Sequence, residues 1–184
     1  WDPTDNSVVF TRRVPWRTWR RYNELARIQP STGEITTLLS GHRAREPDVD
    51  KDGRIAFVVA DARSSRLAIG DRELSTWRTV DLPGVQEVDG PRWSPDGRHI
   101  VVSGWRRGGY RDLYLVRLHG DSSTTIKRLT RDRALDIDPA WAEDGSAVYF
   151  SSDRDGVFDL FAYDLSTTSV RRVTSVATGA FDPA

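Results

Sequence analysis

The sequence predicts an all-β fold, a β-propeller built from four-stranded antiparallel blades. One blade unit is clearest within residues 91–118, where Pro-Asp-Gly at 95–97 is typical of a tight turn. Residues 100–102 are a β-branched run with the composition of a buried strand, and residues 112–116 alternate as a third strand does. A fourth strand is expected at 125–130. No segment has the pattern of an amphipathic helix.

The unit occurs four times, which indicates a repeat architecture. Residues 140–145 match residues 92–97 in register, and weaker copies begin near residues 48 and 1. The turn acids recur with a spacing in the forties, a period that four-stranded propeller blades share; they are Asp5, Asp52, Asp96 and Asp144. We therefore expect a single propeller segment with blades at about residues 1–47, 48–91, 92–139 and 140–184.

The repeated motifs resemble the TolB-like propeller family. Blades of that family carry a Trp-Ser-Pro-Asp-Gly turn, an apolar strand and an Asp-Leu-Tyr strand, and here these stand at 93–97, 100–102 and 112–114. The likeness covers essentially the whole chain and weakens in the first two units, where Val49 and Lys51 replace Trp and Pro. The resemblance implies a protein or peptide partner and a periplasmic or secreted location. It also implies that the four blades belong to a six-bladed ring.

Composition narrows the possible functions. The chain has 184 residues, enough for one domain, with 27 basic and 27 acidic residues, and this balance argues against nonspecific nucleic-acid binding. It contains no Cys, which excludes thiol chemistry, and no Met, so we expect an excised or processed piece of a longer protein. No apolar run is long enough to span a membrane.

Arginine and tryptophan alternate in a segment between Phe10 and Tyr22, which we expect to be a long loop between the second and third strands of the first blade. This pairing is enriched at interface hot spots and also stacks on bases or sugars. The alternative is structural: the indoles cover a neighbouring blade and the guanidinium groups pair with Asp61 or Glu24. The candidate partner-binding residues of this segment are Arg12, Arg13, Trp16, Arg17 and Trp19.

Acidic residues recur at the joints that lead into the blades. Three positions before the first-strand Trp or its counterpart stand Glu46 and Asp138, with Gly90 in the third unit, and Asp182 holds the same place in the joint after the fourth unit. First strands line the channel of a propeller, so these acids would give its mouth a negative field suited to a cation or a basic partner segment. Alternatively, each acid accepts N–H groups of the following turn, as Asp before Pro often does.

The loops between second and third strands should lie on the same face as the joints. In the third and fourth units these loops carry charged side chains that complete the candidate partner-binding set. Those residues are Arg106, Arg107, Arg154 and Asp155.

The sequence carries no catalytic constellation, so we expect no enzyme activity, no metal and no cofactor. Nucleophile elbows, metalloprotease and redox motifs and phosphate-binding Gly-rich loops are all missing. Asp48 begins a stretch that imitates a calcium-binding loop, but its twelfth position is Val59 instead of a bidentate Glu. The three His residues fall in unrelated blade positions.

Two functions fit these observations. The first is a non-catalytic binding scaffold of the bacterial envelope, or of a secreted protein, that presents its channel-mouth loops to a protein or peptide. The second is a propeller that screens substrates for a peptidase, as in prolyl-oligopeptidase-like enzymes, with the catalytic domain outside this segment. Both interpretations rest largely on the resemblance of fold.

Overall fold

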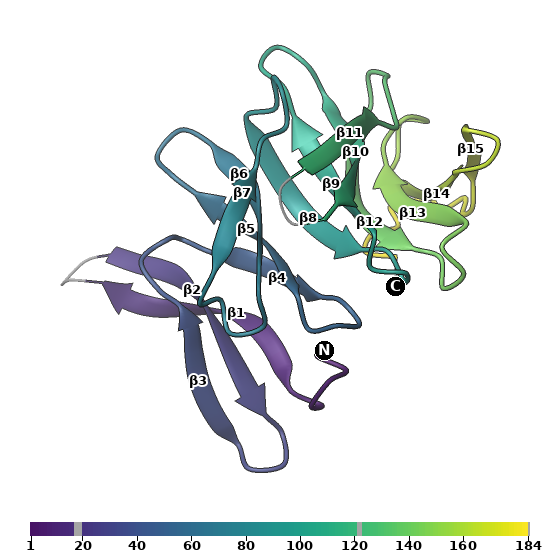
Figure 1. The fold of residues 1–184 in the computed structure, drawn as a ribbon. Coiled ribbons are helices and arrows are strands. Elements are labelled where there is room, and N and C mark those ends of the chain that lie inside the picture. The colour runs from purple at the N-terminus through teal and green to yellow at the C-terminus, as the bar shows by residue number, and fades with distance from the viewer. Residues whose placement is uncertain (17–19, 121–122, 184) are drawn as a thin grey trace. The chain divides into compact units, whose positions relative to one another are not determined.

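The computed structural model describes residues 1–16, 20–120 and 123–183, and within these ranges the chain contains strands and no helix. The strands form four antiparallel sheets (Figure 1), in which sequential strands are neighbours. The chain divides into two compact units, Trp1–Asp81 and Leu82–Ala184, and each unit contains two sheets. The expected all-β blades are confirmed.

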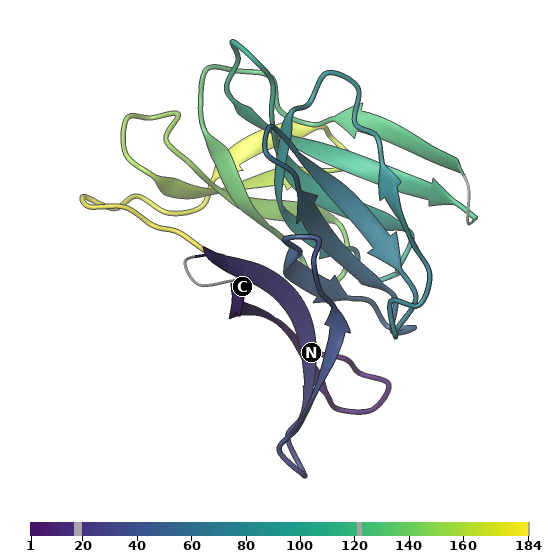
Figure 2. The same ribbon diagram turned by 90° about the vertical axis from the view of Figure 1, so that its left-hand side faces the viewer.

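The first unit holds a three-stranded and a four-stranded sheet, and Figure 2 shows both from the side. The first sheet comprises β1 (Val8–Trp16), β2 (Arg20–Gln29) and β3 (Glu34–Leu39). The second sheet comprises β4 (Arg45–Val49), β5 (Ile55–Ala60), β6 (Ser65–Gly70) and β7 (Trp77–Val80).

The second unit holds two four-stranded sheets. The third sheet comprises β8 (Glu87–Trp93), β9 (His99–Trp105), β10 (Arg111–His119) and β11 (Ser123–Arg128). The fourth sheet comprises β12 (Asp136–Trp141), β13 (Ala147–Ser152), β14 (Asp159–Asp164) and β15 (Ser169–Arg172). Strands β4, β8 and β12 begin a few residues before the repeat boundaries expected from the turn motif, because the joints are themselves part of the first strands.

The first blade differs from its expected form. Its sheet has three strands in the described part of the chain, and the expected first strand is reduced to one isolated bridge between Asp2 and Ser7. The repeat pattern predicts a core position for Trp1, but 63% of its surface is exposed. No described strand pairs with β1 on that side, so the indole has no sheet to pack against.

The Arg- and Trp-rich segment is largely a hairpin extension, so the expectation of a long loop is wrong for its described residues. Strand β1 continues through Trp16, and its pairing with β2 includes Val14 opposite Tyr22 and Pro15 opposite Arg21. A β-branched residue opposite an aromatic one is a favourable cross-strand pair. This pair helps to explain why strand pairing continues into a segment whose many charged residues had suggested a loop. Arg17 and Trp19 lie outside the described residues.

Each unit buries an apolar core between its two sheets. In the first unit Leu25 of β2 packs in one cluster with Ile55 and Phe57 of β5. In the second unit Leu113 of β10 shares a cluster with Phe150 of β13, and both are fully buried. Burial of one such side chain stabilises the fold by about 1.5–3 kcal/mol. The alternation of apolar residues along the strands thus determines which faces of neighbouring blades meet.

The repeated tight turns form as expected in the second unit. Ser94 N–H donates to His99 O at 2.9 Å, and Gly97 N–H donates to Ser94 O at 2.8 Å. The φ angle of Gly97 is 70°, in the left-handed region that favours glycine. The carboxylate of Asp96 accepts the N–H of Arg98 at 2.9 Å.

The turn of the second blade uses a different acid from the one expected. Asp50 Oδ1 accepts the N–H groups of Asp52 and Arg54 at 3.0 and 2.8 Å, and Asp50 Oδ2 accepts Arg54 Nε at 2.7 Å. The side chain of Asp52 instead pairs with Lys51 at the surface. The Asp-rich stretch that imitates a calcium loop is therefore a hairpin turn whose central carboxylate is already used.

Candidate functional site

In the second, third and fourth blades, the joint and the loop between the second and third strands lie at the same end. In the fourth sheet, Asp136 at the start of β12 pairs with Ser152 at the end of β13. In the third sheet, Glu87 at the start of β8 pairs with Trp105 at the end of β9. We call this end of a blade, with its joint and its second-to-third-strand loop, the joint end. All candidate partner-binding residues that the structure describes belong to joint ends.

The joints share one backbone geometry that the sequence analysis did not anticipate. The φ angles of Glu46, Gly90, Asp138 and Asp182 are 54°, 57°, 53° and 50°, all in the left-handed region. In β4, β8 and β12 a register shift at this position marks a β-bulge, where two residues oppose one. A proline follows each of the four residues. Because Asp and Gly tolerate left-handed backbone better than most residues, the joint acids have a conformational role besides their charge.

In the first unit the joint lies beside the Arg-rich hairpin. The N–H of Glu46 donates to Thr11 Oγ1 of β1 at 2.9 Å, and the Glu46 carboxylate pairs with Arg45. Arg12 Nε donates to Glu24 Oε1 at 2.7 Å, and Arg12 Nη2 donates to Thr37 Oγ1 at 2.8 Å. Arg12 thus pairs with Glu24, as the structural alternative in the sequence analysis expected.

Next to that joint is an open hollow of about 560 Å³ in the first unit. The guanidinium carbon of Arg43 lies 5.0 Å from the centre of the Tyr22 ring, a cation–π contact. The hollow brings together Arg13 and Arg21 of the Arg- and Trp-rich segment with Arg43 and Arg45, which sequence reasoning missed. Its lining residues are Arg13, Arg21, Tyr22, Asn23, Arg43, Arg45 and Ala60.

In the third blade, Arg106 and Arg107 lie in the expected loop. The Arg106 guanidinium covers the joint-end segment at Gly84, where a Cβ added to the glycine would lie 2.9 Å from one of its nitrogens. Arg107 is exposed, and no described residue forms an ion pair or hydrogen bond with its side chain. Arg111, at the start of β10, pairs with Glu87 at 2.9 Å and with Asp89. Arg107 is therefore the more available of the two candidates.

In the fourth blade, Arg154 is turned into the blade. It donates to Asp136 Oδ1 at 2.8 Å, lies 3.3 Å from Asp132, and contacts the Phe161 ring at 4.8 Å. Only 18% of its side chain is exposed. Burial raises the pKa of Asp136, and the hydrogen bonds from Thr130 and Ser152 and the charge of Arg154 only partly offset this effect. Arg154 thus serves first to neutralise a buried carboxylate.

Three of the remaining candidates belong to the fourth blade, and the other, Trp16, belongs to the first. Asp155 is 3.5 Å from Arg172, and both side chains are well exposed. Asp182 is exposed and follows Phe181, whose ring packs on Phe158 at 4.8 Å. Asp138 is half-buried within β12. Trp16 is the last residue of β1, and its side chain lies outside what the structure describes.

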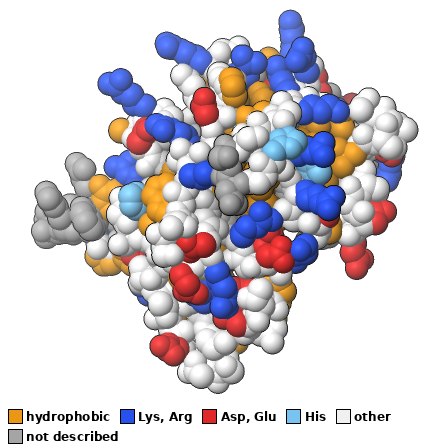
Figure 3. Space-filling view, viewed as in Figure 1, with side chains coloured by type: hydrophobic (Ala, Val, Ile, Leu, Met, Phe, Trp, Pro, Cys, Tyr) orange, Lys and Arg blue, Asp and Glu red, His pale blue; other side chains and the backbone are white. Residues whose placement is uncertain are grey.

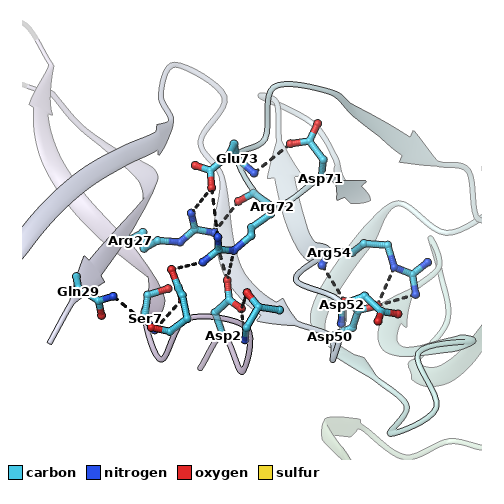
Figure 4. A network of polar contacts seen from close by, with 12 residues as sticks. Asp2, Ser7, Arg27, Gln29, Asp50, Asp52, Arg54, Asp71, Arg72 and Glu73 are labelled. Carbon is cyan, nitrogen blue, oxygen red and sulfur yellow. Dashed lines mark hydrogen bonds and ion pairs between the residues drawn. The ribbon is translucent and has the colours of Figure 1, made fainter. Parts of the chain in front are cut away.

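A polar network at the opposite end of the first unit joins its two blades, and no sequence pattern indicated it (Figure 4). Asp2 Oδ2 accepts Arg72 Nε at 2.9 Å, and Arg27 donates to Glu73 at 2.7 Å and to Arg72 O at 2.7 Å. Burial alone would raise the pKa of Asp2, but hydrogen bonds from Thr4 and Arg72 outweigh it and lower the pKa. The network stabilises the packing of the two blades.

The described residues include no cluster of side chains placed to hold a metal ion. In the ranges 1–16, 20–120 and 123–183, no three His, Cys, Asp or Glu side chains converge as metal ligands would. Among the same residues, no helix is both long and apolar enough to cross a membrane. Figure 3 shows cations and acids interspersed on one face, in keeping with the balanced net charge.

Comparison with known proteins matches residues 31–183 to the family described as TolB beta propeller domain. Protein TolB homolog of Chlorobium luteolum is 33% identical over 131 residues, which are 68% of this chain and 27% of that protein. Tricorn protease homolog 1 of Streptomyces coelicolor is 25% identical over 181 residues, 92% of this chain and 16% of that protein. The crystal structure of TolB from Acinetobacter baumannii aligns with a TM-score of 0.76 at 23% identity, covering 94% of this chain and 42% of that chain. The chain thus spans well under half of each.

Proposed function

Because the chain belongs to the TolB beta propeller domain family, we propose that it is a non-catalytic binding scaffold of the bacterial envelope or of a secreted protein. Its joint ends present charged side chains to a protein or peptide partner. The periplasmic or secreted location and the six-bladed ring follow from the family resemblance. In this proposal the joint acids and loop cations of each blade form the polar surface that contacts the partner.

The observation that carries the proposal is that some of the charged candidate residues form ion pairs within their blade and others do not. Arg12 and Arg154 are engaged within their blades by Glu24 and Asp136. Arg13 and Arg107 have no carboxylate partner among the described residues, although each lies at a joint end. Charged side chains that the fold does not use are available to steer and orient a partner.

The proposal is tested by site-specific photo-crosslinking in the intact protein. A photoreactive residue at position 107 should capture a partner from envelope extract, whereas the same residue at position 117 should capture little. Arg117 is also an exposed cation of the same blade, near the opposite end of β10. Equal capture at both positions, or none at 107, would contradict a joint-end binding surface.

A second candidate function has one observation in its favour, the similarity to a protein named as a protease homolog. In this alternative the propeller restricts which substrates reach a catalytic domain outside residues 1–184. The intact protein would then hydrolyse peptides, and an enlarged side chain at position 107 would change the preferred substrate length. Absence of hydrolysis by the intact protein across a broad peptide library would reject this alternative.

A further inference from the structure

The hollow in the first unit collects positive charge that nothing in the described fold fully neutralises. It is lined by four arginines on four segments: Arg13 on β1, Arg21 on β2, Arg43 in the joint and Arg45 on β4. Four like charges around one hollow repel one another, which is unfavourable for folding alone. The chain as a whole has equal numbers of acidic and basic residues, so a lining with four arginines and no acidic residue is a local departure from that balance.

The neighbouring acids already have partners. Glu24 accepts Arg12, and Glu46 pairs with Arg45. Asp61 is the acid next to the lining residue Ala60, but its carboxylate accepts the N–H groups of Arg63 and Ser64 at 2.7 and 2.9 Å. Three of the four guanidinium groups thus have no carboxylate partner among the described residues, namely Arg13, Arg21 and Arg43.

Contacts with other residues fix the position of the Arg43 side chain in the hollow. Tyr22 supports the guanidinium of Arg43 through the cation–π contact at 5.0 Å, and Arg43 Nη1 lies 3.5 Å from the backbone oxygen of Asp61. Arg13 is opposite Asn23 in the β1–β2 ladder, and Arg21 is opposite Pro15. Residues two apart on a strand project to the same side, so Arg13 and Arg21 lie on one face of the hairpin.

We propose that this hollow binds carboxylates of an acidic peptide segment, with Arg13 and Arg21 as the principal contacts. The planar guanidinium fork matches a carboxylate with two parallel hydrogen bonds, and several forks on different strands suit several side chains in sequence. A volume of about 560 Å³ is in the range of sites that hold small molecules or a few side chains. The inference rests on the proposed scaffold function and specifies the chemistry of its partner.

A free polyanion offers the same chemistry, and the peptide is favoured for two reasons. Phosphate sites in proteins commonly use several backbone N–H groups at a helix N-terminus or a nest, and no helix occurs in the described part of the chain. The hollow is open and lies beside the joint of β4, where an extended segment has access.

The test measures fluorescence anisotropy of a short labelled Asp/Glu-rich peptide on the intact protein at low salt. Its Asn/Gln counterpart, inorganic phosphate and citrate serve as comparison ligands. The acidic peptide should bind, the neutral one should not, and affinity should fall as added salt screens the charges. Saturating binding of citrate or phosphate without binding of the peptide would overturn the peptide assignment.

Matched variants locate the binding. Arg13→Gln/Arg21→Gln should weaken peptide binding at least about tenfold, since each charge-assisted pair contributes strongly. Arg13→Lys/Arg21→Lys retains the charge and loses the fork, so it should give an intermediate loss. Arg117→Gln/Arg171→Gln removes the same charge from exposed positions on the second unit and should leave binding nearly unchanged.

The outcome separates this inference from the scaffold proposal. An equal loss in both Gln double variants would mean a nonspecific charge effect and would overturn the site. Melting temperatures of the variants should be unchanged or higher, because like-charge repulsion is relieved. If crosslinking at position 107 persists while the acidic peptide fails to bind, the scaffold function stands and the carboxylate site does not.

Discussion

The indole Nε1 of Trp141 donates a hydrogen bond of 3.0 Å to the backbone carbonyl of Arg92, which joins the first strands of two neighbouring blades. Trp141 lies on β12 and Arg92 on β8. In the sequence, the first-strand Trp marks the repeat. In the structure its polar atom also connects one repeat to the next.

Trp141→Phe should therefore destabilise the second unit. The variant keeps an aromatic ring, although a smaller one, and the Arg92 carbonyl loses its indole donor, which by itself costs about 1 kcal/mol. Urea denaturation of the variant and the wild type measures this loss. Trp105→Phe removes an indole hydrogen bond to Gly109 O in an exposed loop and should cost much less. Equal losses in the two variants would show that the Trp141 contact between blades has no special weight.

Gly90→Ala should be more costly than an ordinary Gly→Ala change. Gly90 has a φ of 57° in the β8 bulge, and a Cβ there would lie 3.3 Å from Cδ of Pro139 in the neighbouring joint. Left-handed backbone and crowding together should lower the free energy of unfolding by about 1–3 kcal/mol. Gly108→Ala, with a φ of 74° and open space around it, isolates the backbone contribution. The prediction fails if thermal denaturation gives the two variants the same loss.

Features that depend on a few consecutive residues could be predicted from the sequence. The Pro-Asp-Gly turn at Gly97 and the strand predicted at 100–102 follow from turn chemistry and β-branched composition, and both are present, the strand extending over His99–Trp105. The repeat then extends these local patterns to four sheets. These repeated local patterns were enough to predict the family and the all-β class.

Features that depend on pairing across the sheet could not be predicted in the same way. The sequence marked Arg154 as a surface cation, but folding brings the buried Asp136 to it from the preceding joint. The left-handed joint at Asp138 likewise depends on a bulge between two strands. The sequence pattern that accompanies this left-handed backbone is the proline that follows each joint residue. Only part of the cationic hollow could be predicted from the sequence. Arg13 was a candidate residue, but Arg43 lies in a segment that shows no recognisable pattern.

A repeated ion pair closes the third and fourth blades, and it should show coupling in double-mutant cycles. Arg128 donates to the buried Asp112 at 2.6 Å, and Arg172 pairs with the buried Asp159 in the equivalent place. Asp112→Ala should lower the free energy of unfolding by about 2–4 kcal/mol, because it leaves Arg128 half-buried without its partner.

The double variant Asp112→Ala/Arg128→Ala supplies the matching control. Its loss should be smaller than the sum of the two single losses by at least about 1 kcal/mol, since the two residues interact directly. The equivalent cycle at Asp159 and Arg172 should give coupling of the same sign. Strict additivity in both cycles would rule out a structural role for the pair.

Asp71 should make stability depend on pH in the acid range. Its carboxylate accepts the N–H groups of Ser75 and Thr76 and both of their hydroxyl groups, at 2.5–3.0 Å. These bonds, that of the Thr76 side chain foremost, lower the pKa of Asp71 from 3.8 to about 2. Asp71→Ala should lower the free energy of unfolding by about 1 kcal/mol near pH 6, because the loop between β6 and β7 loses its anchor.

The sign of the pH effect follows from the lowered pKa of folded Asp71. Its stabilisation is complete above the ordinary value of 3.8 and is lost as the pH falls through about 2. The difference in unfolding free energy between wild type and Asp71→Ala should therefore shrink steadily between pH 5 and pH 2, as followed by denaturant titrations. Asp81→Ala, which removes an exposed acid that accepts no hydrogen bond from the described residues, should show no such trend. A wild-type advantage that is the same at pH 6 and pH 2 would mean that the Asp71 charge does not stabilise the loop.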